Sequence, residues 1–417
     1  MNPVSSPPQL ISYTDYRLKL AEIRQLPSDG QRREALKPVH AQGRATATAF
    51  LEQSLLKALN DTTETESLIW FWFNHFNVFW LKGLLGPALP LYVEQAIRPH
   101  IQGKFRELLL ATMTQPLMII YLDNFFNYAN KINENYAREL LELHTLGVDG
   151  GYTQKDVQEV ARLLTGFGLR PLPPVTQWPA KFAPLVKEQG EFMFDPRRHD
   201  FGSKQILGHK IEGSGYTELE QLADILTQHP ATAQHIARKL CLYLVGEQPD
   251  PKLVKQAAQT FSDTQGDLAA VITFIQQQSS RLPAQKTFKD PYRWVTSSIR
   301  LLATGRPIQS VGPALQWLNT LGQPLFGRHT PDGYSLKGTD WMGAGQMAQR
   351  FELSLTLVNT MPKLLQQRLD APATLAHPNL KQLMSTLSPN SQTTVKQAKK
   401  PAQALALLLS SPEFMYG

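Results

Sequence analysis

Apolar residues recur at helical spacing along most of the chain, and this periodicity constrains the fold more than any other feature. Patterns with apolar side chains three and four positions apart run through residues 32–59 and 134–146, and they resume after residue 216. Such spacing gives a helix one apolar stripe, which must be buried against other helices. The clearest pattern follows Glu66 and consists of Leu68, Ile69, Trp72, Phe73, Phe76 and Phe79.

One proline-rich stretch separates two helical regions. Its later part, between about Glu191 and Ile211, alternates polar and apolar residues and predicts a β-hairpin. The sequence therefore predicts a mainly α fold, a multi-helix two-lobed globular protein with a small β-hairpin insertion between the lobes. The predicted segments are an N-terminal extension (1–31), a helical lobe (32–169), the Pro-rich loop and β-hairpin (170–215) and a C-terminal helical lobe (216–417).

Composition narrows the class of partner. The 42 basic and 35 acidic side chains give a formal net charge of +7, with no block of five or six like charges. We therefore expect no nucleic acid partner, whereas mild basicity favours acidic polysaccharide, phosphate-bearing envelope material or anionic lipid equally. The single cysteine, Cys241, allows no intrachain disulfide and no thiolate zinc site.

Several other classes lack their sequence signatures. No stretch reaches the about 18 apolar residues of a membrane-spanning helix, so no membrane span is expected. Residues 1–9 have neither the basic head nor the apolar stretch of a secretion signal. The nucleophile elbow, the phosphate-binding loop, the dinucleotide fingerprint and the zincin motif are also missing, so serine hydrolases, nucleotide enzymes, Rossmann oxidoreductases and zincins have no support.

The most distinctive string runs from Asn133 to Gly147, NENYARELLELHTLG, and GYT follows it at Gly151. It resembles the signature of domain-of-unknown-function family 1800, and further matching strings extend the resemblance over roughly residues 45–355. The resemblance implies a bacterial, commonly exported protein, periplasmic or secreted, with no agreed activity. It also implies a partner protein of another uncharacterised family, numbered 1501. The further strings are Trp72–Phe76, Ile97–His100, Tyr121–Asn124, His199–Lys204, His229–Ala233, Ala237–Leu240 and Leu321–Leu325.

Three carboxylates and one arginine share one face of the helix predicted over 134–146, at about 100° per residue. One interpretation is a solvated surface with i, i+4 pairs between Arg138 and the glutamates on either side. The other is a buried network or a site in which neighbouring carboxylates have their pKa values driven apart, as general acid–base catalysis requires. In that case Glu139 and Glu142 are the acid and base, Arg138 sets their charge, and Asn135 is a substrate-binding candidate.

Two further groups of residues have a structural and a functional interpretation. The predicted hairpin contains His199, Asp200 and Lys204. In the structural interpretation these residues form ordinary turn contacts. In the functional one they reach over the helical face, where His199 and Asp200 are catalytic candidates and Lys204 is a substrate-binding candidate. His75 lies among aromatic residues and is either packed in the core or part of the floor of a sugar-binding pocket.

No cofactor is predicted, and a metal ion is not excluded. Glu139 and Glu142 would need further ligands, because His144 lies about 160° from Glu139 around the helix. We expect His144 to be a core histidine bonded to a backbone carbonyl.

Two hypotheses for function follow. The first is an enzyme that acts on a polysaccharide or related envelope polymer through the clustered carboxylates. The second is a noncatalytic envelope or secretion-associated protein that binds a partner protein, with the charged helix as an internal brace. An enzyme should expose Glu139 and Glu142, whereas a brace should bury and pair them.

Overall fold

Helices form most of the protein, as predicted. The structure is a computed structural model that describes residues 10–61, 63–82, 85–281 and 287–416. The N-terminal half contains α1 (Tyr13–Arg24), α2 (Asp29–Asn60), α3 (Thr65–His75), α4 (Leu89–Leu91), the π-helix η3 (Tyr92–Ile97), α5 (Phe105–Met113), α6 (Pro116–Tyr121), α7 (Asn135–Glu139), the π-helix η6 (Leu140–Thr145) and α8 (Gln154–Leu163).

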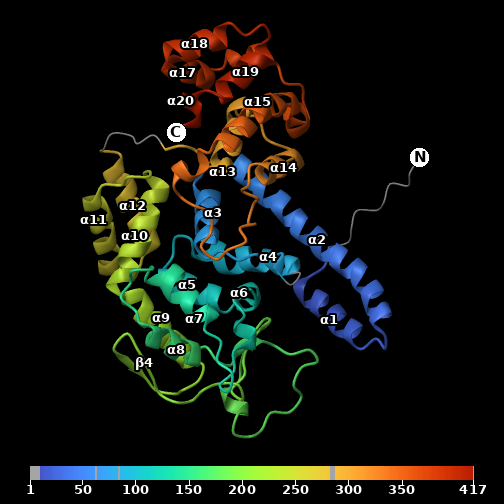
Figure 1. Ribbon diagram of the computed structural model, residues 1–417, viewed down its shortest axis with the longest axis vertical. Coiled ribbons are helices and arrows are strands. Elements are labelled where there is room, and N and C mark those ends of the chain that lie inside the picture. Colours follow the sequence, from blue (N-terminus) through green and yellow to red (C-terminus); the bar gives the residue numbers. More distant parts are fainter. Residues whose placement is uncertain (1–9, 62, 83–84, 282–286, 417) are drawn as a thin grey trace.

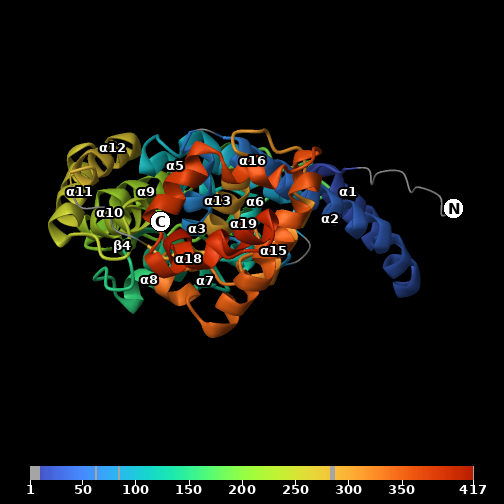
Figure 2. The ribbon, with the colours of Figure 1, turned by 90° about the horizontal axis from the view of Figure 1, so that it is seen from above.

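The C-terminal half is a second series of helices. Figure 1 shows α10 to α12 packed side by side on one flank and the last helices gathered at one end of the molecule, and Figure 2 shows α1 and α2 on the opposite flank. The helices are α9 (Thr217–Gln228), α10 (Pro230–Leu244), α11 (Pro251–Asp263), α12 (Leu268–Ser279), α13 (Pro291–Ala303), α14 (Gly312–Thr320), α15 (Ala344–Leu365), α16 (Ala371–Leu375), α17 (Pro378–Thr386), α18 (Pro389–Lys396), α19 (Pro401–Leu409) and α20 (Pro412–Met415).

Local sequence explains where many of these helices begin. Proline often occupies the first helical position, where its missing N–H breaks no hydrogen bond, and a polar residue before it caps the helix. Asp250 caps α11 in this way, Asp290 caps α13 and Ser388 caps α18. At α8, Thr153 and Asp156 form a capping box with reciprocal hydrogen bonds.

The strands form two small sheets, so the prediction of a single hairpin was too simple. β3 (Phe192–Phe194) lies between β1 (Phe167–Leu169) and β2 (Lys187–Gln189) in an antiparallel sheet. A separate hairpin pairs β4 (Lys204–Ile206) with β5 (His209–Ile211). Its two-residue turn places both Leu207 and Gly208 at positive φ, the conformation of a tight hairpin turn.

The core is continuous through the molecule. Buried apolar side chains form one cluster that extends from α1 to α20 and includes residues of β1, β3, β4 and β5. The division at 170–215 stays a prediction, but the core does not stop there. Within the described ranges, no helix is both long enough and apolar enough to cross a membrane.

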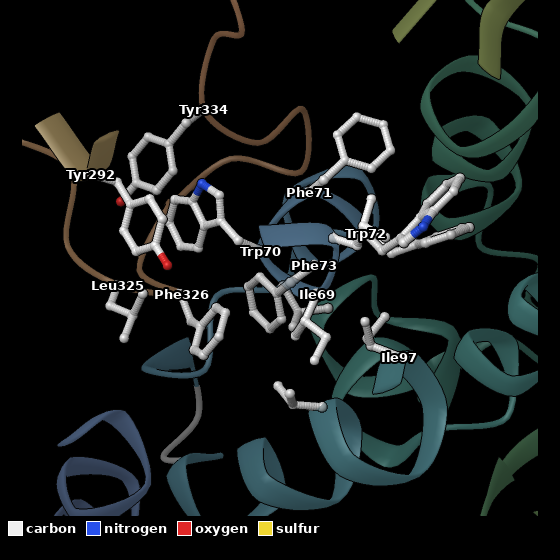
Figure 3. Close-up of a cluster of buried hydrophobic side chains, with 14 of the residues drawn as sticks. Ile69, Trp70, Phe71, Trp72, Phe73, Ile97, Tyr292, Leu325, Phe326 and Tyr334 are labelled. Carbon is white, nitrogen blue, oxygen red and sulfur yellow. The ribbon is translucent and has the colours of Figure 1, made fainter. Parts of the chain in front are cut away.

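Helix α3 occupies the centre of this core (Figure 3). All eight of its residues from Leu68 to His75 are buried, so it has no solvent-facing side over this length. Trp70 stacks on Tyr292 of α13 with ring centroids 4.6 Å apart, and Phe73 packs on Phe326 at 4.3 Å. The first half of the chain therefore packs on the second through aromatic contacts of α3.

Removing one of these rings should cost much of the stability of the protein. We expect Trp70→Ala to lower the free energy of unfolding by about 3–5 kcal/mol, because the indole is buried and its removal leaves a cavity. Urea denaturation followed by circular dichroism measures the loss. Phe351→Ala is the matched control, since Phe351 is 52% exposed. Equal losses in the two variants would contradict the central role of α3.

Candidate functional site

The helix that carries the distinctive sequence string changes type in its middle. α7 ends at Glu139 and the chain continues as the π-helix η6, in which the N–H of Leu146 donates to the carbonyl of Leu141 at 2.9 Å. The hydroxyl of Thr145 likewise donates to the carbonyl of Leu140, five residues earlier. A π-helical turn holds more residues than an α-helical one, so side chains after Leu140 leave the positions that regular α-helical spacing predicts.

Arg138 forms a surface pair and not a buried network. Its guanidinium bonds Glu134 at 3.0 Å and the side-chain oxygen of Gln154 at 3.0 Å, and the Arg138 side chain is 41% exposed. The predicted pair between Glu134 and Arg138 is confirmed. The predicted pair between Arg138 and Glu142 is wrong, because the π-helical turn moves Glu142 out of the i, i+4 position.

Glu139 is a partly buried carboxyl group without a bonding partner. Among the described residues, none forms a hydrogen bond or an ion pair with it. Burial raises the pKa of Glu139, the negative charges of Glu142 and Asp332 raise it further, and Arg138 opposes the shift. Glu139 therefore keeps its proton to a higher pH than an ordinary glutamate.

Glu142 lies one helical turn further along and is held differently. The hydroxyl of Tyr152 donates to its carboxylate at 3.3 Å, which orients the group. Burial raises the pKa of Tyr152, and the Glu142 charge adds to that shift, so the phenol remains a donor at neutral pH. Two neighbouring carboxyl groups thus differ in their bonding, one oriented by a hydroxyl group and one unpaired.

Three histidines lie together here: His144 is part of η6, and two others lie beside this helix. The Nε2 of His75 bonds the carbonyl of His144 at 3.1 Å, and the Nε2 of His235, on α10, bonds the carbonyl of Leu143 at 3.2 Å. The ring centroids of His75 lie 6.4 Å from His144 and 6.0 Å from His235. Burial and the charge of Lys239 lower the pKa of His144 to about 3 and that of His235 to about 4, so both are neutral at pH 7.

Two nitrogen atoms of this histidine cluster are buried and unpaired within the described structure: Nδ1 of His75 and Nε2 of His144. His144 is a core residue, as predicted. The prediction that its ring bonds a backbone carbonyl is wrong. The rings of His75 and His235 are the ones that bond backbone carbonyls. His75 is also a core residue, packed edge-on against Trp72 and Phe76. Unpaired buried nitrogens are costly, so the cluster is a departure from ordinary core packing.

Lys239 lies one turn after His235 on α10 and is partly buried. Its amine makes no hydrogen bond or ion pair with the described residues. Burial lowers the pKa of Lys239 to about 8, and the charge of Asp332 opposes this shift. The Lys239 amine therefore loses its proton at a lower pH than an ordinary lysine does.

Asp332 reaches this region on the loop between α14 and α15. The loop is fastened to the end of α3, where Asn74 donates to the carbonyl of Tyr334 at 2.9 Å and Asn77 donates to that of Thr330 at 2.7 Å. Gly333 has a φ of 74°, and a Cβ there would lie 2.1 Å from the backbone oxygen of Asn74. The Asp332 side chain is 54% exposed and pairs with Arg328 at 3.4 Å, and Glu139, Glu142 and Lys239 are each partly buried.

The candidates from the predicted hairpin belong to a different network. His199 bonds the carbonyl of Thr165 at 2.7 Å and Glu218 at 2.9 Å, and Lys204 bonds the same glutamate at 2.6 Å. All three charged or imidazole side chains are fully buried. Within the described residues, none of their hydrogen bonds involves Glu139 or Glu142.

The remaining candidates also have structural partners. Asp200 pairs with Arg162 at 2.8 Å and accepts a bond from the N–H of Gly202, as a turn-forming residue does. Asn135, which is exposed, donates to the carbonyl of Leu122 at 3.2 Å. The part of the chain that the structure describes contains no group of three acidic, histidine or cysteine side chains that could hold a metal ion.

Arg138 and Arg162 should differ in their effect on stability. We expect Arg138→Ala to change the free energy of unfolding by less than about 1 kcal/mol, since its partners are solvent-exposed. Arg162→Ala should cost about 1–3 kcal/mol, because it removes charge-assisted bonds to Asp200 and Glu159 in a less exposed setting. Chemical denaturation of both variants compares them, and a larger loss for Arg138→Ala would contradict the surface assignment.

The buried network should make stability depend on pH through Glu218. Bonds from His199 and Lys204 outweigh the effect of burial and hold the pKa of Glu218 below its usual value. A lowered pKa in the folded state stabilises the protein above the unfolded-state pKa, and the contribution disappears as pH falls through the folded-state pKa. Glu218→Gln should therefore lower Tm at pH 7 by more than it does at pH 3. Glu220→Gln, an exposed change on the same helix, should show no such difference.

Comparison with known proteins identified one protein family that matches the sequence. No curated protein and no solved structure matched the chain. A family model described as a protein of unknown function, DUF1800, matches residues 5–416, well beyond the span of the strings noted in the sequence. The chain therefore belongs to the DUF1800 family.

Proposed function

We propose that this protein is an extracytoplasmic enzyme that cleaves glycosidic bonds in a polysaccharide or related envelope polymer. Glu139 is the general acid and Glu142 the general base. The observation that supports the proposal is the unpaired, partly buried Glu139 carboxyl, whose pKa is raised beside a second carboxylate. A structural brace would have paired it.

The proposed chemistry needs two carboxyl groups with different protonation states. Protonated Glu139 gives its proton to the leaving glycosidic oxygen as the bond from the sugar carbon to that oxygen breaks. Glu142 takes a proton from the attacking water, whose oxygen forms the new bond to the sugar carbon. The hydroxyl of Tyr152 keeps the Glu142 carboxylate oriented for this role.

Lys239 and Asp332 complete the proposed site from outside the carboxylate helix. The Lys239 amine is free of other bonds within the described structure and can donate to a substrate hydroxyl. The negative charge of Asp332 raises the pKa of Glu139, and it also opposes the lowering of the pKa of Lys239. Asp332 therefore helps to keep both Glu139 and Lys239 protonated.

Glu139→Gln should abolish turnover while Tm stays unchanged or rises, because the carboxyl group has no partner to lose. Turnover is measured as new reducing ends released from extracted envelope polysaccharides. In the parent enzyme, activity should fall as pH rises through the raised pKa of Glu139, since the acid then loses its proton.

The matched control is Glu134→Gln, which changes a glutamate on α7's N-terminal side that pairs with Arg138. It should keep full turnover. The proposal fails if the parent releases no reducing ends from any polysaccharide fraction and Glu139→Gln melts well below the parent.

A second candidate, binding of a partner protein, has its own observation. Helix α15 exposes Phe351 and Leu355, one turn apart, at 52% and 46%. Neighbouring exposed apolar side chains of this kind are typical of interaction surfaces. If this candidate is correct, a protein of family 1501 should co-elute with the parent in size-exclusion chromatography and should not co-elute with Phe351→Ser/Leu355→Ser.

A further inference from the structure

A cavity of about 560 Å³ lies away from the carboxylate helix, between α1, the segment after α6 and the first part of the proline-rich stretch. Its volume is in the range of small-molecule binding sites. Its wall combines aromatic and aliphatic side chains, among them Phe125 and Phe126, with Arg17, Arg24, Arg197 and Arg198.

The charges around this cavity are unbalanced. Four arginines line it against one carboxylate, Asp195, and that carboxylate already bonds Arg197 at 3.0 and 2.8 Å. Arg17 pairs with Glu191. Arg24 and Arg198 have no acidic partner among the described residues. The cavity wall therefore carries positive charge that the protein itself leaves uncompensated.

Arg198 is the most constrained of these cations. Its guanidinium lies 3.9 Å from the ring centroid of Tyr128 and donates to the carbonyl of Phe125. Its Nε is buried and has no hydrogen-bond partner in the described structure. The guanidinium is partly removed from water, and this burial lowers the pKa of Arg198 from its usual value. A partly desolvated guanidinium gains most from a bidentate anion.

One large apolar side chain of the wall is exposed, and the others that line the cavity are partly or fully buried. Phe126 is 56% exposed, although its ring packs edge-on against that of Phe125 at 5.3 Å. An exposed aromatic ring at the rim of a cavity leaves apolar surface in contact with water, and a bound ligand could cover that surface. Charge and apolar surface thus occur in one cavity.

We infer that this cavity binds an amphiphilic anion, a molecule with one carboxylate or phosphate group at the arginines and an apolar body against the aromatic and aliphatic wall. Arg24 and Arg198, which have no acidic partner among the described residues, supply the charge complementarity, and Phe126 supplies apolar surface to be covered. The inference does not depend on the proposed glycosidic chemistry, because it uses none of the same residues.

Isothermal titration with dodecanoate and dodecyl phosphate, both below their micelle concentrations, tests the inference in the full-length protein. We expect at least one of them to bind, and the pair to show which acidic group is preferred. Dodecanol and inorganic phosphate should each bind at least tenfold more weakly than the better ligand, because each lacks half of the required chemistry.

Two exposed positions give variants that should fold normally. Arg24→Glu and Phe126→Ser should each weaken binding by about tenfold, through charge and apolar contact respectively. Arg33→Glu is the matched control, an exposed arginine on α2 that does not line the cavity, and it should leave binding within twofold of the parent. Dodecanol binding as tightly as the anions, or Arg24→Glu and Arg33→Glu having equal effects, would overturn the inference.

Discussion

The rest of the structure depends on the complete burial of helix α3. A helix with aromatic side chains around its whole circumference cannot lie at a surface, so other segments must cover it on every side. Those segments come from both halves of the chain, since Trp70 stacks on Tyr292 and Phe71 packs on Tyr243, both far along the sequence. The polar residues at the end of the same helix fasten the loop that carries Asp332. Core and candidate site thus share one element.

The helical part of the fold could be predicted because its signals are local. Apolar spacing predicts a helix from the residues of one segment alone. The capping pair Thr153 and Asp156 likewise predicts where α8 begins. The sheets were harder to predict, because β1 pairs with β3 across a long intervening loop, with Phe167 opposite Phe194. No short-range pattern reports such a partner, so the sequence indicated one hairpin where two sheets exist.

The candidate site shows the same limit. The bond between Glu134 and Arg138 was predictable since it follows helical spacing. The change to a π-helix after Glu139 was not, because apolar spacing predicts a helix without distinguishing an α-helical turn from a π-helical one. Lys239 and Asp332 were missed because they belong to separate segments. For Lys239, the sequence signal that could have been used is its spacing from His235, one turn away on the same helix.

The π-helix η6 also has a consequence for how chains of this kind can vary in length. A hydrogen-bonded ring that spans five residues in place of four accommodates one additional residue without lengthening the helix by a full turn. A deletion of a single residue between Leu140 and Thr145 would let this stretch run as an ordinary α-helix. Glu139 would keep its place, and the side chains after the deletion would stay close to their present neighbours, because the residue removed is the additional one that the π-helical turn accommodates. At this helix, a change of one residue in length can therefore leave the packing on both sides of η6 in place.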